Sequence, residues 1–412
     1  MVKEFITCGL DIGTTKVRAV VIQKRRGSEK LSVIGVGEVI SAGVKRGMIV
    51  DVNEAIESIR NAISQAEKTS GKTIESVFVN LSGPHITARS SKGVVAVSRA
   101  DQEISKEDKQ RVLQTTEAIS IPANRKIVHV IPKEFIVDGE GGIMEPLGMS
   151  GVRLEVNALL IDCSIPVISN STKAVSSAGL DIDEFIVSTI ASSKAVLSKR
   201  QKELGVLVLD IGGGTTGISI FEDGSMIHTA ILPIGSNYIT NDIAIGLRTE
   251  IDVAEKVKLE YGTANADSIN KRDMLDLSEL GFSDRGSVSR KHIAEIIHAR
   301  LDEIFELTEK ELKKVSKQGL LPGGVVLVGG GSKMPHIVEI VRDKLKLPVQ
   351  IGVPGDGLDG ILDRVADPEY AVAVGLALMA FDNQNISANH QSFSSSGGLW
   401  SKIFKSLKTF MP

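Results

Sequence analysis

The phrase Asp-Ile-Gly occurs twice in this chain, each time between two apolar runs. The first copy begins at Asp11 and follows the run Glu4 to Cys8, and the second begins at Asp210 and follows Val206 to Leu209. Each has the pattern of a strand, a tight turn and a second strand, which indicates a duplicated half facing its partner across a cleft. The turn residues that could hold phosphate are Gly13, Thr14, Thr15, Lys16, Gly212, Gly213, Gly214 and Thr215.

The chemistry of such turns favours a phosphate bound with a divalent cation. Glycine lets the backbone approach an anion and point successive N–H groups at its oxygens. Threonine hydroxyls add donors, and Lys16 adds a positive charge. A carboxylate in the same turn repels bare phosphate, so Asp11 and Asp210 are expected to hold Mg²⁺ through its water ligands. A single copy of this phrase would be typical of an ordinary hairpin.

A third glycine cluster follows the apolar run Val325 to Val328 and precedes a helical stretch from His336 to Lys346. It has neither the spacing of a P-loop nor that of a dinucleotide-binding turn. Its residues Gly330, Gly331 and Ser332 are expected to flank a nucleoside, with a plain strand–helix connection as the alternative. Glu255 and Lys258 share one face of an expected helix and could hold ribose hydroxyls, or form a solvated surface pair.

Alternating strands and helices indicate an α/β protein with an insertion. A helix is expected from Asp51 to Lys68, with its isoleucines on one buried face. Residues 83–162 differ in character, with strand alternation around one helix from Ser105 to Ile119, and read as an inserted α+β module. The longest apolar run, Ala371 to Phe381, is too short to span a bilayer and predicts a buried helix in which Gly375 allows close packing.

These motifs resemble the actin, Hsp70 and sugar-kinase ATPase superfamily, and within it the FtsA family of bacterial cell-division proteins. The phrases that carry the resemblance span most of the chain in family order. They are Gly9-Leu10-Asp11-Ile12-Gly13-Thr14-Thr15-Lys16-Val17, His129-Val130-Ile131-Pro132, Val208-Leu209-Asp210-Ile211-Gly212-Gly213-Gly214-Thr215-Thr216 and Val328-Gly329-Gly330-Gly331-Ser332-Lys333.

The resemblance implies an actin-like duplicated fold with ATP and Mg²⁺ between its halves. It further implies head-to-tail polymerisation, binding of the C-terminal peptide of FtsZ by the outer part of the second half, and contacts of the inserted module with later division proteins. The expected parts are a first half at 1–82 and 163–204, the insertion at 83–162, a second half at 205–237 and 301–381, its outer subdomain at 238–300, a flexible linker at 382–397 and a membrane-targeting helix at 398–412.

One departure from the superfamily concerns hydrolysis. Actin and Hsp70 relatives place a Gln or Glu before the second hairpin, where it orients the attacking water. The matching stretch here, Ala191 to Leu197, contains neither an acid nor an amide. Because a water-orienting group contributes strongly to phosphate transfer, we expect a weak ATPase at most, with ATP acting mainly as a conformational ligand.

The C-terminal segment has the pattern of an amphipathic helix. At roughly 100° per residue, its apolar side chains fall within an arc of about 140°, opposite the lysines. An apolar face with Trp and Phe beside a lysine face is typical of a helix lying in an anionic membrane surface, and a helix docked on its own domain is the alternative. The membrane-facing candidates are Leu399, Trp400, Lys402, Ile403, Phe404, Lys405, Leu407, Lys408 and Phe410.

Composition limits the remaining classes. The formal charge of −3 over 412 residues argues against a general nucleic-acid binder. The two cysteines, Cys8 and Cys163, lie in apolar surroundings and favour a reducing cytosol. The resemblance and the tail imply a location at the cytoplasmic face of the bacterial inner membrane, at the division site. A pilus-assembly relative does not explain the tail. A sugar kinase would need a catalytic carboxylate that we do not find, and an Hsp70 chaperone would need a further domain.

Overall fold

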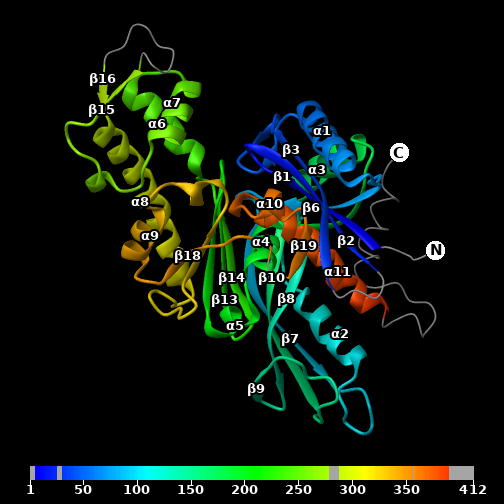
Figure 1. The fold of residues 1–412 in the computed structure, drawn as a ribbon. Helices are drawn as coiled ribbons and strands as arrows, with labels where there is room; N and C mark the ends of the chain where they lie inside the picture. The colour runs from blue at the N-terminus through cyan, green and yellow to red at the C-terminus, as the bar shows by residue number, and fades with distance from the viewer. Residues whose placement is uncertain (1–4, 26–29, 278–286, 356, 389–412) are drawn as a thin grey trace.

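The computed structural model describes residues 5–25, 30–277, 287–355 and 357–388, so the predicted tail helix at 398–412 lies outside the described residues. Two β-sheets form the body of the molecule, and two smaller subdomains lie at opposite ends of it (Figure 1). The predicted α/β, actin-like arrangement with an inserted module is therefore present. Among the described residues, no helix is long and apolar enough to cross a membrane.

The first sheet has six strands in the order β11-β6-β1-β2-β3-β19. Its strands alternate side chains between two helical layers, as strand geometry requires. Val77 and Val79 join the core with α1, whereas Phe78 faces α4 and α11. The elements are β1 (Phe5–Ile12), β2 (Lys16–Lys24), β3 (Leu31–Ile40), β6 (Ser76–Leu81), β11 (Asp181–Val187), β19 (Leu358–Gly360), α1 (Val52–Ser70), α3 (Ile165–Ser177), α4 (Ser188–Val196), α10 (Leu362–Val365) and α11 (Ala371–Ala388).

Helix α1 was predicted to start at Asp51, and its first residue is Val52. The Asp51 side chain caps it by accepting hydrogen bonds from the N–H groups of Asn53 and Glu54, and Gly71 ends it in the left-handed conformation. A short two-stranded hairpin precedes α1. Its strands are β4 (Val44–Lys45) and β5 (Met48–Ile49).

The second sheet has the order β14-β13-β12-β17-β18. Leu207 and Leu209 pack toward α8 and α9, whereas Val206 and Val208 face the first half. Helix α4 contacts α11 on one side and β12 and β13 on the other. The elements are β12 (Val206–Ile211), β13 (Thr216–Glu222), β14 (Ser225–Leu232), β17 (Val325–Val328), β18 (Val349–Ile351), α5 (Lys199–Leu204), α8 (Arg290–Lys314), α9 (Ile337–Leu345) and the single turns η3 (Gly330–Lys333) and η4 (Pro368–Tyr370).

The two smaller subdomains lie at opposite ends of the molecule (Figure 1). The inserted sheet, β7-β10-β8-β9, is antiparallel and packs Phe135 and Leu154 against α2. The insertion contains β7 (Thr87–Ala96), α2 (Lys106–Thr116), β8 (Arg125–Val137), β9 (Glu140–Ile143) and β10 (Arg153–Ser164). The outer subdomain contains α6 (Ser236–Leu247), α7 (Ile251–Tyr261), η1 (Ala266–Ser268), β15 (Met274–Asp276) and β16 (Ser287–Ser289).

The C-terminal elements correct one predicted boundary. The sequence assigned all of 301–381 to the second half, but β19 pairs with β3 and α11 packs on β1, so the chain returns to the first half. Glycines allow this return: a β-carbon on Gly9 would lie 2.2 Å from the Ala373 carbonyl oxygen, and one on Gly375 would lie 1.8 Å from the Ala191 carbonyl oxygen. The close packing predicted for Gly375 is therefore confirmed.

The predicted start of the linker, at residue 382, is also wrong. Helix α11 continues to Ala388, so the first residues of the expected linker at 382–397 are helical. Ser and Asn are weaker helix formers than the alanines and leucines before them, which is why the sequence pattern placed the end at Phe381. The remainder of that segment lies outside the described residues.

Candidate functional site: two matched glycine hairpins

The two Asp-Ile-Gly turns have the same backbone construction. In the first, the Gly13 N–H donates to the Lys16 carbonyl oxygen at 3.1 Å, and in the second the Gly212 N–H donates to the Thr215 carbonyl oxygen at 2.9 Å. Each turn therefore links two antiparallel strands, β1 with β2 and β12 with β13. The predicted duplication extends to the geometry of the turn.

The two hairpins face each other at close range. A β-carbon added to Gly213 would lie 2.1 Å from Thr15 Oγ1, and one added to Gly214 would lie 2.7 Å from Thr14 Oγ1. The threonines of the first turn thus occupy the space that side chains would need in the second. The structure brings together Gly13, Thr14, Thr15, Gly212, Gly213, Gly214 and Thr215, as the sequence predicts.

Asp11 and Asp210 lie at the base of these turns and influence each other. Asp11 is buried and accepts a hydrogen bond from Asn80 Nδ2 at 2.8 Å. Burial raises its pKa to about 6, although the Arg18 guanidinium acts in the opposite direction. Burial, and then the charge of Asp11, raise the pKa of the half-buried Asp210 to about 7.

This carboxylate pair fits a divalent cation. Two negative charges held near each other away from water are stabilised when a cation lies between them. Carboxylate oxygens are also the ligands that Mg²⁺ prefers. Space beside Asp210 depends on Gly329, because a β-carbon there would lie 2.5 Å from Asp210 Oδ1. Among the described residues, no group of three or more His, Cys, Asp or Glu side chains could hold a metal by itself, so phosphate or water would complete the coordination.

The third glycine turn packs directly on the second hairpin. Gly329 has φ +80° and donates its N–H to the Pro368 carbonyl oxygen at 3.0 Å. A β-carbon on Gly331 would lie 2.3 Å from Ile211 Cγ2, so only glycine permits this contact. Ser332 is buried and its hydroxyl donates to the Gly329 carbonyl oxygen at 2.7 Å. A hollow of about 620 Å³ adjoins Ser332 and Lys333, but none of the hairpin residues lines it.

Glu255 and Lys258 lie on α7 and form an ion pair of 2.7 Å. Lys258 is buried and its Nζ donates to Thr240 Oγ1 at 2.8 Å, which is not the arrangement of a solvated surface pair. The pair also adjoins the second hairpin, since Lys258 Nζ lies 3.5 Å from the Ser236 carbonyl oxygen and the Ser236 N–H donates to the Gly212 carbonyl oxygen. The two residues predicted to hold ribose therefore lie beside the second hairpin.

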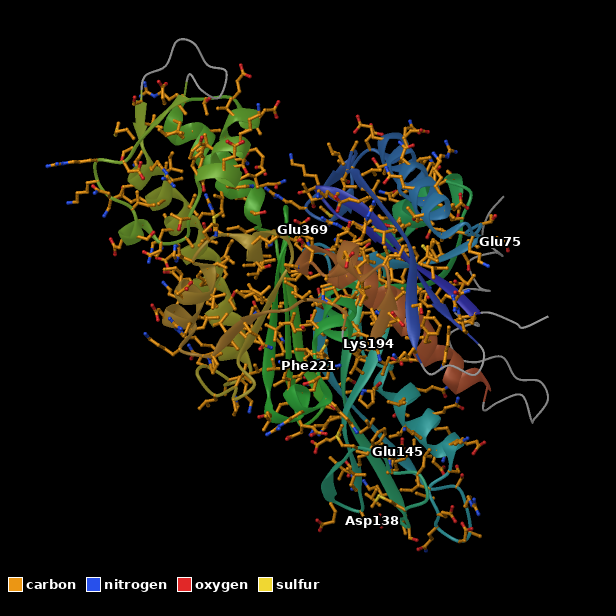
Figure 2. The ribbon with its side chains drawn as sticks, viewed as in Figure 1. Glu75, Asp138, Glu145, Lys194, Phe221 and Glu369 are labelled. Atoms are coloured by element: carbon orange, nitrogen blue, oxygen red, sulfur yellow. The ribbon has the colours of Figure 1, made fainter. Side chains whose placement is uncertain are left out.

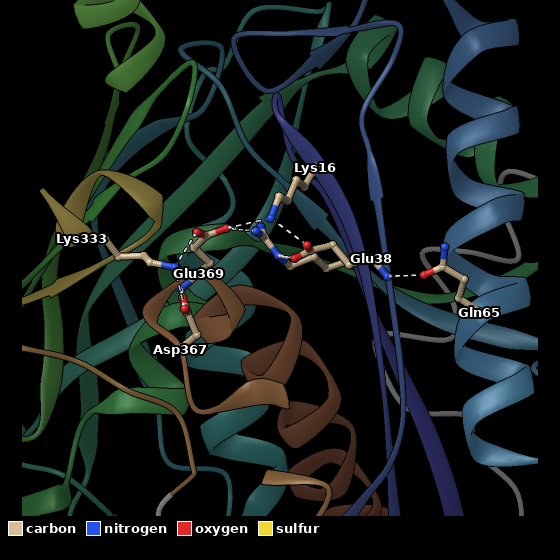
Figure 3. A network of polar contacts seen from close by, with 7 residues as sticks. Lys16, Glu38, Gln65, Lys333, Asp367 and Glu369 are labelled. Atoms are coloured by element: carbon tan, nitrogen blue, oxygen red, sulfur yellow. Dashed lines mark hydrogen bonds and ion pairs between the residues drawn. The ribbon is translucent and has the colours of Figure 1, made fainter. Parts of the chain in front are cut away.

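Lys16 forms ion pairs that the sequence did not predict. Its ammonium lies 2.7 Å from Glu38 Oε1 and 3.7 Å from Glu369 Oε2. Arg18 forms ion pairs with the same two carboxylates, and Lys333 contacts Glu369 at 3.2 Å and Asp367 at 2.7 Å (Figure 3). Figure 2 places Glu369 between the two halves.

Sequence reasoning missed this ion-pair network. Lys16 and Arg18 are two residues apart on β2, so their side chains lie on the same face of the strand. The alternation of side chains along a strand could therefore have predicted that they lie together. Glu369 could not have been found in that way, because η4 reaches β2 only through the return of the chain to the first half.

Helix α4 provides no carboxylate or amide to the cleft. Its Thr189 and Ser193 hydroxyls are paired with Thr229 and Ser219, each at 2.7 Å, and Lys194 pairs with Asp382. These bonds join α4 to the second sheet. The absence of a water-orienting residue therefore applies to the whole of the helix that the structure describes.

Comparisons with known proteins agree with this architecture. A family profile described as "Cell division protein FtsA" matches residues 207–375, and one described as "SHS2 domain inserted in FTSA" matches residues 83–162. The cell division protein FtsA of Pseudomonas aeruginosa is 38% identical over 391 residues, which cover 94% of this chain and 93% of that protein. The protein of the same name from Bacillus subtilis is 38% identical over 384 residues, which cover 93% and 85%.

Solved structures show the same fold at low sequence identity. A PilM–PilN type IV pilus biogenesis complex superimposes with a TM-score of 0.68 at 19% identity, covering 90% of this chain and 98% of that one. MreB5 of Spiroplasma citri bound to ADP superimposes with a TM-score of 0.53 at 14% identity, covering 95% and 99%. These likenesses establish an actin-like fold and do not favour a pilus protein over a division protein. The identity shared along nearly the whole chain decides between them, and the chain belongs to the FtsA family of actin-like cell-division proteins.

Proposed function

We propose that this division protein binds ATP with Mg²⁺ between its two halves and attaches the FtsZ ring to the membrane. The observation that carries the nucleotide proposal is the meeting of two glycine turns over a pair of carboxylates whose pKa values are raised. Neither turn alone would surround a polyphosphate, whereas the two together offer backbone N–H groups and hydroxyls from both sides. The ADP bound to MreB5, a neighbour of the same fold, supports this choice of ligand.

Each group of the cleft has an assigned role. Asp11 and Asp210 would hold the Mg²⁺ ion, which neutralises phosphate charge when bound. The turns at Gly13–Thr15 and Gly212–Thr215 would hold phosphate oxygens. Glu255 and Lys258 would exchange part of their mutual pairing for ribose hydroxyls, and Gly330, Gly331 and Ser332 would flank the adenosine.

Turnover should be slow. The hydroxyls of Thr189 and Ser193 are occupied by partners in the second sheet, and α4 presents no carboxylate that could orient water. A bound nucleotide would therefore act by holding the two halves together. Steady-state phosphate release at ordinary kinase rates would contradict this part of the proposal.

The attachment to the membrane rests on sequence alone. The apolar and lysine faces of residues 398–412 would bind an anionic lipid surface, each lysine near the surface contributing on the order of 1 kcal/mol. One such helix binds reversibly, so polymerisation through other copies would strengthen attachment by avidity. The outer subdomain at 238–300 would receive the FtsZ C-terminal peptide, and the insertion would contact later division proteins.

Nucleotide binding is tested by titrating the purified protein with a fluorescent methylanthraniloyl ATP in Mg²⁺ and in EDTA. We expect saturable binding that weakens at least tenfold in EDTA, because the two carboxylates then repel the phosphates. Equal affinity in both conditions would remove the role assigned to Asp11 and Asp210.

Membrane attachment is tested separately through Trp400, the one tryptophan of the chain. Anionic vesicles should shift its fluorescence to the blue, and Trp400→Glu should abolish co-sedimentation with vesicles while leaving ATP binding unchanged. A Trp400→Glu protein that still sediments with vesicles would show that the tail is not the anchor.

A further inference from the structure

The hairpin formed by β4 and β5 rests on both phosphate turns at once. The Gly47 N–H donates to Thr14 Oγ1 at 3.0 Å, which joins it to the first turn. A β-carbon added to Gly214 would lie 3.0 Å from Arg46 Cα, so the same hairpin touches the second turn. Its two-residue loop, Arg46-Gly47, therefore lies against both turns.

Arginine is an unfavourable residue for the backbone of this loop. Arg46 has φ +51° and Gly47 has φ +71°, and positive φ at both central residues is the mark of a type I′ turn. Asn-Gly or Gly-Gly suits such a turn, whereas a long side chain in the left-handed region costs roughly 1–2 kcal/mol. Arg46 therefore adopts a backbone conformation that its long side chain does not favour.

The Arg46 guanidinium has no carboxylate partner among the residues that the structure describes. Its carbon lies 5.5 Å from the centre of the Tyr238 ring, on α6 of the second half. The Arg300 guanidinium lies 5.6 Å from the centre of the same ring and is paired with Asp242 and Glu303. The carboxylates near Tyr238 are thus occupied by Arg300, and the charge of Arg46 is available to a ligand.

Lys16, the cation of the first turn itself, does not fill this role. It is engaged by Glu38 and Glu369, as is Arg18. Tyr238 lies three residues after Gly235. A β-carbon added to Gly235 would lie 2.5 Å from the Gly212 carbonyl oxygen, so this segment packs against the second turn. Arg46 therefore extends from one wall of the phosphate site to the other.

We propose that Arg46 is the phosphate-binding cation of this cleft, held against Tyr238 until a polyphosphate bound between the two turns accepts its guanidinium. The assignment rests on the proposed ATP binding. In this assignment the β4–β5 hairpin senses phosphate, because the contact of Arg46 with Tyr238 changes when the guanidinium binds a ligand.

Arg46→Asn is a sharp test, because asparagine favours the type I′ turn while removing the charge. We expect this variant to melt at or above the temperature of the parent and to bind Mg·ATP roughly 10- to 100-fold more weakly, the effect of losing a hydrogen bond to a charged group. Affinity for adenosine should not change. Lys45→Asn, an equally exposed cation of the same hairpin, is the matched control and should bind Mg·ATP as the parent does.

The outcomes separate this inference from the proposed function. If the parent protein binds Mg·ATP and Arg46→Asn binds it equally well, Arg46 is not a phosphate ligand although the nucleotide site stands. If Lys45→Asn loses as much affinity as Arg46→Asn, the effect is one of general charge and the assignment fails. If the parent does not bind Mg·ATP in the first place, the proposed function fails and the assignment fails with it.

Discussion

The first and second hairpins share one turn geometry but contribute different things to the cleft. The first presents side chains, Thr14, Thr15 and Lys16, and its Asp11 has a hydrogen-bond donor in Asn80. The second presents backbone, three successive glycines, and its Asp210 accepts no side-chain hydrogen bond from the described residues. A duplicated turn thus became two complementary surfaces, with hydroxyls of one half in the spaces left by glycines of the other.

The largest expected effect comes from exchanging the two aspartates for asparagine. Asp210→Asn should raise the free energy of unfolding of the metal-free protein at pH 8 by roughly 2–4 kcal/mol, because it removes a half-buried charge whose pKa is raised to about 7. It should weaken Mg·ATP binding by roughly 100-fold. Denaturant unfolding and nucleotide titration measure the two changes.

Asp11→Asn is the matched variant. It should stabilise less than Asp210→Asn, because the pKa of Asp11 is raised only to about 6 and Asn80 already supports its carboxylate. Equal stabilisation by the two substitutions would show that the hairpins do not differ in their electrostatics.

A pH dependence follows from the same raised pKa values. Between the unfolded pKa near 3.8 and the folded values of about 6 and about 7, the folded state binds more protons than the unfolded state. The free energy of unfolding attributable to the pair should therefore decrease as pH rises through this window and level off above about 7. The difference between the parent and the Asp11→Asn, Asp210→Asn double variant isolates it. We expect a change of roughly 2–4 kcal/mol between pH 5 and pH 8, the upper value applying without solvent screening. Added Mg²⁺ should reduce the slope, and a slope of the opposite sign would contradict the assignment.

A smaller effect should reveal the fit between threonines and glycines. Gly213→Ala places a β-carbon against Thr15 Oγ1. It should lower the free energy of unfolding, or weaken the packing of the two halves against each other, by about 1–2 kcal/mol. Thr15→Ala should restore most of this loss in the double variant, giving a coupling energy of about 1 kcal/mol in a double-mutant cycle.

Gly13→Ala provides the contrast in the first hairpin. Its β-carbon would meet the Lys16 carbonyl oxygen at 2.7 Å, which is backbone, so no side-chain truncation at Thr15 should relieve it. If Thr15→Ala rescued both glycine variants equally, the proposed complementarity between the hairpins would be absent.

The sequence predicted those parts of the site that lie within local patterns. Asp11 and Asp210 each follow an apolar strand, and the glycines after them belong to one turn, so the two hairpins and their meeting could be predicted. The return of β19 and α11 to the first sheet could not be read, because it depends on backbone approach at Gly9 and Gly375 rather than on any period of apolar residues. The position of Arg46 was also hidden, since its contact with Tyr238 forms only when the two halves are assembled.

Lys16 is held by two carboxylates that the sequence did not predict as its partners, and its substitution should have the smallest effect. Its ion pairs with Glu38 and Glu369 are partly exposed, and such pairs contribute less than about 1 kcal/mol. Lys16→Gln should therefore change stability by less than about 1 kcal/mol and Mg·ATP affinity by less than about threefold, because Arg18 still neutralises both carboxylates and Arg46 still reaches the phosphates. Parallel titrations of Lys16→Gln and Arg46→Asn measure the contrast. A loss for Lys16→Gln as large as that for Arg46→Asn would mean that nucleotide draws Lys16 away from its carboxylates, and that the first hairpin supplies its own phosphate cation.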